Sequence, residues 1–179
     1  APITVSKTGV LTMNAGKITS NIVNNGESIE ISGGGVRVSA GGTFILNNGS
    51  IDNNTASAGG ISVGDIGADS ANGKTNMIMN GGIISSNSSS GPINAGGGIQ
   101  IFPGSDFEMN DGIISDNYGN TGGGIFISDQ YVTGYNGIDY SNTYSTPYEK
   151  YIEVNGTTMN MNGGLIYKNT SYSGGGIFV

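Results

Sequence analysis

The sequence predicts an all-β fold, a right-handed single-stranded parallel β-helix of about five coils with three short strands each. Two observations predict it. A nine-residue pattern recurs five times, and short apolar-x-apolar triplets precede each copy. Internal repeats with a period of about 20 to 50 residues are typical of stacked repeat folds. Apolar residues that alternate with polar ones at period two mark strands with one buried face.

The nine-residue pattern reads apolar, Asn, any, Gly, any, Ile, any, any, Asn. Its copies span residues 13–21, 46–54, 79–87, 109–117 and 161–169. The Ile marks the third strand of each coil, and the first asparagine follows the second strand. We expect these first asparagines to stack at one corner as a hydrogen-bonded ladder along the helix axis. Asparagine also tolerates the left-handed backbone that a sharp corner needs. The ladder asparagines are Asn14, Asn47, Asn80, Asn110 and Asn162.

Two further triplets supply the first and second strands of each coil. The tightest spacings between successive first strands are 25 and 26 residues, which leaves room for three strands and three turns. First strands begin at Ile3, Val36, Ile61, Ile99, Ile125 and Ile177. In the third and fourth coils the side chains expected to point inward are Ile61, Val63, Met77, Met79, Ile84, Ile99, Ile101, Phe107, Met109 and Ile114.

Composition bounds the class of protein. A hydrophobic share of 35% and a charged share of 11% favour one folded domain over residues 1–179 rather than disorder. With 6 basic and 13 acidic residues the net charge is -7, so we expect no nucleic-acid partner. No stretch approaches the roughly 20 apolar residues that span a bilayer, so we expect no membrane insertion. The chain has no cysteine and no histidine, and we expect no cofactor.

The repeat resembles a known group of proteins. Residues 107–117, followed by Gly122-Gly123-Gly124-Ile125, are similar to repeats of bacterial and archaeal adhesin-like surface proteins. They resemble more loosely the repeats of chlamydial polymorphic outer membrane proteins, which pair a Gly-Gly-x-Ile motif with a Phe-x-x-Asn motif. Here Ile114 stands where that second motif has Phe. The resemblance covers nearly the whole chain and implies an extracellular location at the cell surface or envelope, with a scaffold or adhesive role.

Catalysis by a β-helix of the glycan-processing type would need clustered carboxylates beside cationic side chains. This chain has one arginine, Arg37, and its acidic group at 106–116 falls on different strands and turns. That group is Asp106, Glu108, Asp111 and Asp116. Paired carboxylates perform acid/base chemistry, but we interpret these as solvated surface acids and expect no catalytic residue. Asp65 and Asp69 offer oxygen ligands for Ca²⁺, but they lack the regular spacing of a dedicated metal site.

Two insertions interrupt the repeat. Val5 to Leu11, Val38 to Phe44 and Ile101 to Phe107 are each six residues apart, whereas Val63 to Met77 is fourteen and Ile127 to Met159 is thirty-two. Both insertions, at 64–75 and 128–158, should therefore project from one corner. The longer one holds six of the nine tyrosines. They are Tyr131, Tyr135, Tyr140, Tyr144, Tyr148 and Tyr151.

Two interpretations of these tyrosines stay open. Tyrosine among small polar residues is typical of recognition surfaces, and loops on a rigid scaffold are where binding residues usually lie. Alternatively, the tyrosines pack on outward apolar positions of neighbouring coils. Those positions are Ile78, Ile83, Ile113 and Leu165.

Three functions follow from these observations. The first is a non-catalytic, adhesin-like binding or scaffold domain whose partner is a glycan or protein of a host or neighbouring cell. The second is a structural subunit of a cell-envelope layer, sheath or fibre that stacks on copies of itself, since neither end shows a polar cap. The third, a glycan-processing enzyme of the β-helix type, has the least support from the residues.

Overall fold

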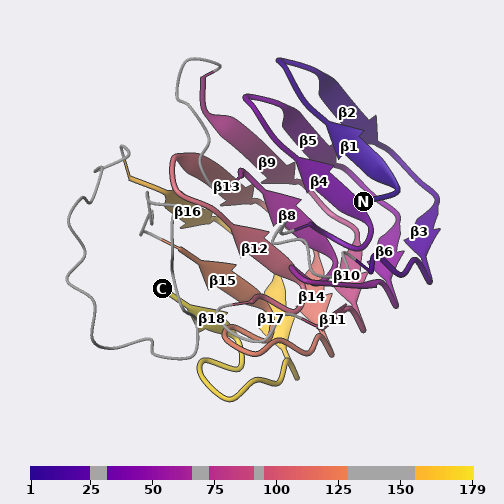
Figure 1. The fold of residues 1–179 in the computed structure, drawn as a ribbon, viewed down its shortest axis with the longest axis vertical. Helices are drawn as coiled ribbons and strands as arrows, with labels where there is room; N and C mark the ends of the chain where they lie inside the picture. The colour runs from indigo at the N-terminus through magenta and orange to yellow at the C-terminus, as the bar shows by residue number, and fades with distance from the viewer. Residues whose placement is uncertain (25–31, 66–72, 91–94, 129–155) are drawn as a thin grey trace.

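The computed structural model describes residues 1–24, 32–65, 73–90, 95–128 and 156–179, and all its regular elements are β-strands. The strands form three long sheets whose members stack one above another (Figure 1). Sheet A contains β1 (Ile3–Val5), β4 (Val36–Val38), β8 (Ile61–Val63), β12 (Ile99–Ile101), β15 (Ile125–Ile127) and β18 (Ile177–Phe178). Sheet B contains β2 (Val10–Met13), β5 (Thr43–Leu46), β9 (Thr75–Met79), β13 (Ser105–Met109) and β16 (Thr158–Met161). Sheet C contains β3 (Lys17–Thr19), β6 (Ser50–Asp52), β10 (Ile83–Ser85), β14 (Ile113–Ser115) and β17 (Leu165–Tyr167).

The chain visits the sheets in the order A, B, C and then returns to A, so each coil contributes one strand to each sheet. Every strand pair within the three sheets is parallel. In sheet A, Ile99 lies between Ile61 and Ile125, as the repeat alignment requires. The prediction of a parallel β-helix of about five coils is confirmed.

The inward-facing positions form one continuous core. All ten side chains predicted to point inward in the third and fourth coils are between 0% and 1% exposed. The outer coils are less enclosed, and Ile3, Leu11, Ile18, Met159 and Ile166 are partly buried against the same core. Period-two alternation therefore identified the core-facing side chains of the third and fourth coils. In β8, β12 and β15 the middle residues Ser62, Gln100 and Phe126 are buried as well.

The return from sheet C to sheet A adds a feature that the sequence did not predict. β7 (Thr55–Ala56) and β11 (Ser88–Ser89) pair in parallel as a fourth, two-stranded sheet. Isolated bridges continue this column to Ile22 in the first coil and to Tyr118 and Thr170 in the last two coils. Equivalent return segments lie one coil apart, so their backbone N–H and C=O groups hydrogen-bond to each other as those of the main strands do.

At the sharp turns the left-handed backbone lies at residues other than the ladder asparagines, although asparagine tolerates it. The glycine two residues after each ladder asparagine takes the left-handed backbone, with φ between 83° and 106°. The residue before the second asparagine of the pattern also takes it, with φ between 53° and 59°. The glycines are Gly16, Gly49, Gly82, Gly112 and Gly164, and the other residues are Ser20, Asn53, Ser86, Asp116 and Lys168. At Gly49 a Cβ would lie 2.6 Å from the carbonyl oxygen of Gly16, so glycine is required there.

Candidate functional site

Both insertions leave the scaffold where sheet A passes to sheet B, an edge we call the insertion corner. β8 ends at Val63 and β9 begins at Thr75, and β15 ends at Ile127 and β16 begins at Thr158. The coil between them, with β12 and β13, makes the same passage through a short turn at 102–104. Figure 1 shows β15 and β16 directly after β12 and β13 in the stack, so a single coil separates the insertions.

Ion pairs to other coils hold the two ends of the first insertion. Asp65 Oδ1, at the start, accepts hydrogen bonds of 2.7 Å from Arg37 Nη2 and 3.1 Å from Arg37 Nε. Lys74 Nζ, at the end, lies 3.0 Å from both carboxylate oxygens of Asp106. These side chains are partly exposed, so each pair adds at most about 1 kcal/mol to stability. Their main effect is to fix where the insertion leaves and rejoins the scaffold.

Asp106 ties the first insertion to the second. In addition to Lys74, its Oδ1 accepts a hydrogen bond of 2.6 Å from Thr158 Oγ1, where the chain rejoins sheet B after the longer insertion. Burial acts to raise the pKa of Asp106, but the hydrogen bonds from Thr158 and Lys74 and the Lys74 charge outweigh it and leave that pKa below its ordinary value. Asp106 is therefore a carboxylate at neutral pH and accepts from both neighbours.

Hydrogen bonds also draw the two ends of the longer insertion together. Thr157 Oγ1 lies 3.3 Å from the carbonyl oxygens of both Ser128 and Phe102. The Ser128 backbone N–H donates to the Ile101 carbonyl at 2.9 Å. The insertion therefore starts and ends at neighbouring points on the scaffold.

The six predicted tyrosines, 131 to 151, lie outside the described residues, as does Asp69. The outward apolar residues that are the alternative packing partners of these tyrosines lie within the described part of the chain. Ile83 is 41% and Leu165 is 52% exposed on sheet C, whereas Ile78 on sheet B and Ile113 on sheet C are half-buried. Ile83, Ile113 and Leu165 thus belong to a sheet that neither insertion leaves or enters. Both interpretations of the tyrosines stay predictions.

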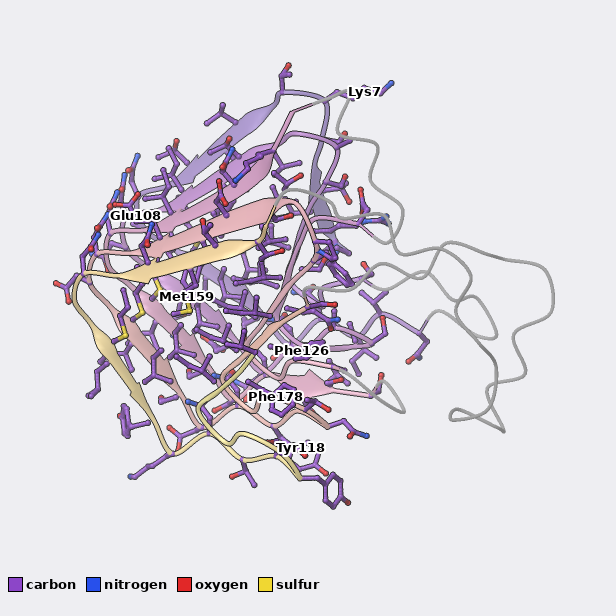
Figure 2. The ribbon with its side chains drawn as sticks, turned by 90° about the vertical axis from the view of Figure 1, so that its left-hand side faces the viewer. Lys7, Glu108, Tyr118, Phe126, Met159 and Phe178 are labelled. Carbon is purple, nitrogen blue, oxygen red and sulfur yellow. The ribbon has the colours of Figure 1, made fainter. Side chains whose placement is uncertain are left out.

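The four surface acids occupy three places. Asp106 and Glu108 share the outer face of β13, Asp111 lies at the corner between sheets B and C, and Asp116 follows β14. Figure 2 shows Glu108 on the outside of the stack, while Met159, on the neighbouring strand, points toward the interior. Within the described residues no three of His, Cys, Asp and Glu gather closely enough to hold a metal ion. Asp65, one of the two Ca²⁺ candidates, is paired with Arg37.

The exposed asparagines form a continuous hydrogen-bonded ladder at the corner between sheets B and C. Each Nδ2 donates to the Oδ1 of the asparagine one coil earlier. The distances are 2.7 Å for Asn47 to Asn14, 2.8 Å for Asn80 to Asn47, 2.9 Å for Asn110 to Asn80 and 2.8 Å for Asn162 to Asn110. The ladder links all five coils on the outside of the molecule.

A second, buried ladder was not predicted as such. It uses the last asparagine of the nine-residue pattern, and Asn54, Asn87 and Asn117 are 0% to 1% exposed. Asn87 Oδ1 accepts 3.0 Å bonds from the backbone N–H and from Nδ2 of Asn54. Asn87 Nδ2 donates at 3.0 Å to Asn117 Oδ1 and at 2.9 Å to the Ile51 carbonyl. The same bonds join Asn21 to Asn54 and Asn117 to Asn169, so the buried amides are satisfied.

The signal for this ladder was present in the sequence, since the last asparagine recurs in all five copies. A strict recurrence of asparagine does not by itself tell a buried column from an exposed one. The residue before it, such as Ser86 before Asn87, has a left-handed backbone in all five copies.

Comparisons with protein-family models, with curated proteins and with solved structures found no match to this chain. The resemblance to adhesin-like repeats therefore stays a sequence-based prediction. In the described part of the chain no helix is long and apolar enough to cross a membrane.

Proposed function

We propose that this protein is a non-catalytic extracellular β-helix of the adhesin-like kind, whose insertion corner contacts a glycan or protein of a host or neighbouring cell. The observation that carries the proposal is the shared origin of both insertions at the insertion corner, with their ends tied to the scaffold. Loops held on a rigid scaffold are where binding residues usually lie.

The ties at the insertion corner favour recognition for a physical reason. A loop whose ends are fixed loses less conformational freedom when it binds, so more of its contact energy appears as affinity. Asp106 accepts from Lys74 and Thr158 and so joins the end of one insertion to the end of the other. The tyrosine-rich composition of the longer insertion adds amphipathic contact area at low entropic cost.

A second candidate function is a structural subunit that stacks end to end, and exposed apolar side chains on the last strands favour it. Met161 is 47%, Leu165 is 52% and Ile177 is 39% exposed. Met159, Met161 and Ile177 line a hollow of about 360 Å³. Strands β16, β17 and β18 each have a hydrogen-bonded neighbour on one side among the described strands. An edge of this kind pairs with the next coil, whether that coil belongs to the same chain or to another copy.

Shortening the longer insertion should abolish binding and leave the scaffold folded. Residues 128–158 are replaced by five residues, the number that separates Ile101 from Phe107. Loop-closure entropy changes slowly with length, so we expect the free energy of unfolding to change by less than about 2 kcal/mol. Binding to glycan arrays and to intact cells should fall at least about tenfold, because the anchoring aromatic side chains are lost.

A full-length variant with the six tyrosines changed to serine is the matched control for loop length, and it should lose binding equally. Binding that survives in a folded shortened protein would place the contact surface elsewhere. A shortened protein that fails to fold would assign the insertion to the core. Sedimentation of the intact protein across concentrations belongs to the same experiment, and assemblies that grow with concentration would support the stacking subunit instead.

A further inference from the structure

We propose that Asn48 is a site of covalent self-modification, where the side-chain amide is converted through a cyclic imide to aspartate and isoaspartate. The inference is independent of the proposed function. It rests on the pair Asn48–Gly49, which lies in the turn from sheet B to sheet C in the second coil.

The fold requires the glycine of this pair. Gly49 has a φ of 103°, and a Cβ there would lie 2.6 Å from the Gly16 carbonyl oxygen and 2.7 Å from Met13 Cε. Glycine is therefore required at this point of the turn. The preceding position in the five coils is occupied by Ala15, Asn48, Gly81, Asp111 and Gly163. Asn48 alone in this column carries an amide.

The geometry at Asn48 brings the reacting groups together. The Gly49 backbone N–H donates to Asn48 Oδ1 at 2.8 Å. The nitrogen therefore lies beside the side-chain carbonyl whose carbon it attacks once this hydrogen bond has broken. Asn48 is exposed, and glycine carries no side chain that would hinder the approach.

In the reaction, the Gly49 nitrogen gives its proton to a solvent base and forms a bond to Asn48 Cγ. The Cγ–Nδ2 bond then breaks, and the amide leaves as ammonia after taking up a proton. Water opens the resulting ring at either carbonyl, which yields aspartate or isoaspartate with no oxidant and no other co-reactant.

Two other Asn–Gly pairs in the described residues are restrained. Asn80, before Gly81, uses Nδ2 to bind Asn47 Oδ1 at 2.8 Å and accepts from Asn110 Nδ2 at 2.9 Å. Asn162, before Gly163, donates to Asn110 Oδ1 at 2.8 Å. The Gly163 N–H points at the Met109 carbonyl at 3.3 Å instead of at its own side chain. The exposed ladder thus holds both amides away from the following nitrogen.

The aspartate product already has a counterpart in the fold. Asp111 occupies the equivalent position two coils later, and the Gly112 N–H donates to Asp111 Oδ1 at 2.7 Å. Asn48 and Asp111 both line a groove of about 500 Å³ with Ile83, Ile113 and Leu165. Conversion to aspartate therefore adds a second carboxylate to this groove and keeps the backbone of the turn, whereas the isoaspartate product adds a methylene group to that backbone.

The test is peptide mapping by mass spectrometry of the full chain, incubated folded in mildly alkaline buffer, with isoaspartyl methyltransferase labelling to detect the isoaspartate. Ring closure at Asn80 requires two ladder hydrogen bonds to break first. We therefore expect imide formation at Asn80 to be about tenfold slower or more than at Asn48. In the urea-unfolded chain the reaction at Asn48, Asn80 and Asn162 should proceed at similar rates, since each precedes glycine.

Two variants complete the experiment. Asn48→Gln should remove the early product, because its longer side chain closes a ring less readily, and Asn48→Asp should unfold at the same urea concentration as the parent. Conversion of Asn80 as fast as Asn48 in the folded protein would overturn the proposal. So would slower conversion of Asn48 in the folded protein than in the unfolded chain, or a markedly less stable Asn48→Asp variant.

Discussion

Replacing Ile114 by Asp should leave the chain without a cooperatively folded state. Ile114 is fully buried on β14, and it lies in register between Ile84 and Ile166. A carboxylate at this position would lose its hydration without a cationic partner, which costs several kcal/mol even when the group takes up a proton. Domains of this size are stable by only about 5–15 kcal/mol, so one such group removes most or all of the stability.

The matched control for this substitution is Ile113→Asp on the same strand. Ile113 points outward and is half-buried, so its carboxylate stays in contact with water and should cost about 1 kcal/mol or less. Circular dichroism during urea titration compares the two variants. An Ile114→Asp protein that is soluble and unfolds cooperatively near the parent's midpoint would show that the assigned face of β14 is wrong.

Replacing Asn87 by Leu should destabilise the protein by about 3 kcal/mol or more, because it orphans several buried polar groups at once. The Asn54 N–H and amide lose their acceptor, and the Ile51 carbonyl and Asn117 Oδ1 lose a donor. Leucine keeps the branched shape and the number of side-chain heavy atoms of asparagine but is larger, so the loss includes some overpacking in addition to the lost hydrogen bonds. Unfolding in urea with unchanged m-value gives the difference in free energy.

Asn80→Leu is the control in the same coil. The side-chain amide of Asn80 makes hydrogen bonds of similar length in the exposed ladder. Water can replace its partners there, so we expect the free energy of unfolding to fall by about 1 kcal/mol or less. Equal losses for Asn80→Leu and Asn87→Leu would mean that burial of the second ladder contributes nothing to stability.

The sequence was sufficient to predict the strand register and the core, because two periodicities specify them together. Period-two alternation identifies the inward side of each strand, and alignment of the copies pairs Met109 with Met79 on one side and with Met161 on the other. The exposed asparagine column followed from the same alignment. The alignment does not say which residue of that turn takes the positive φ, and the structure shows that it is the glycine two residues later.

Other features depend on three-dimensional contacts that the alignment does not contain. The buried and exposed asparagine columns look alike in sequence, and only the stacking of the coils encloses Asn54, Asn87 and Asn117. Asp106 and Thr158 occupy equivalent positions of neighbouring coils, so the alignment places them side by side. Lys74, which binds Asp106, belongs to the first insertion and has no equivalent in the other coils. The tyrosine cluster, at 131–151, lies outside the described residues and stays a prediction.

The measurement that tests this account most directly is hydrogen exchange of the asparagine side-chain amides, resolved by NMR. The stacked coils enclose one amide column and expose the other. Amide protons of Asn54, Asn87 and Asn117 should therefore exchange about a hundredfold slower or more than those of Asn47 and Asn80. Comparable exchange rates for the two columns would contradict the stacking of the coils and, with it, the scaffold that presents the insertion corner.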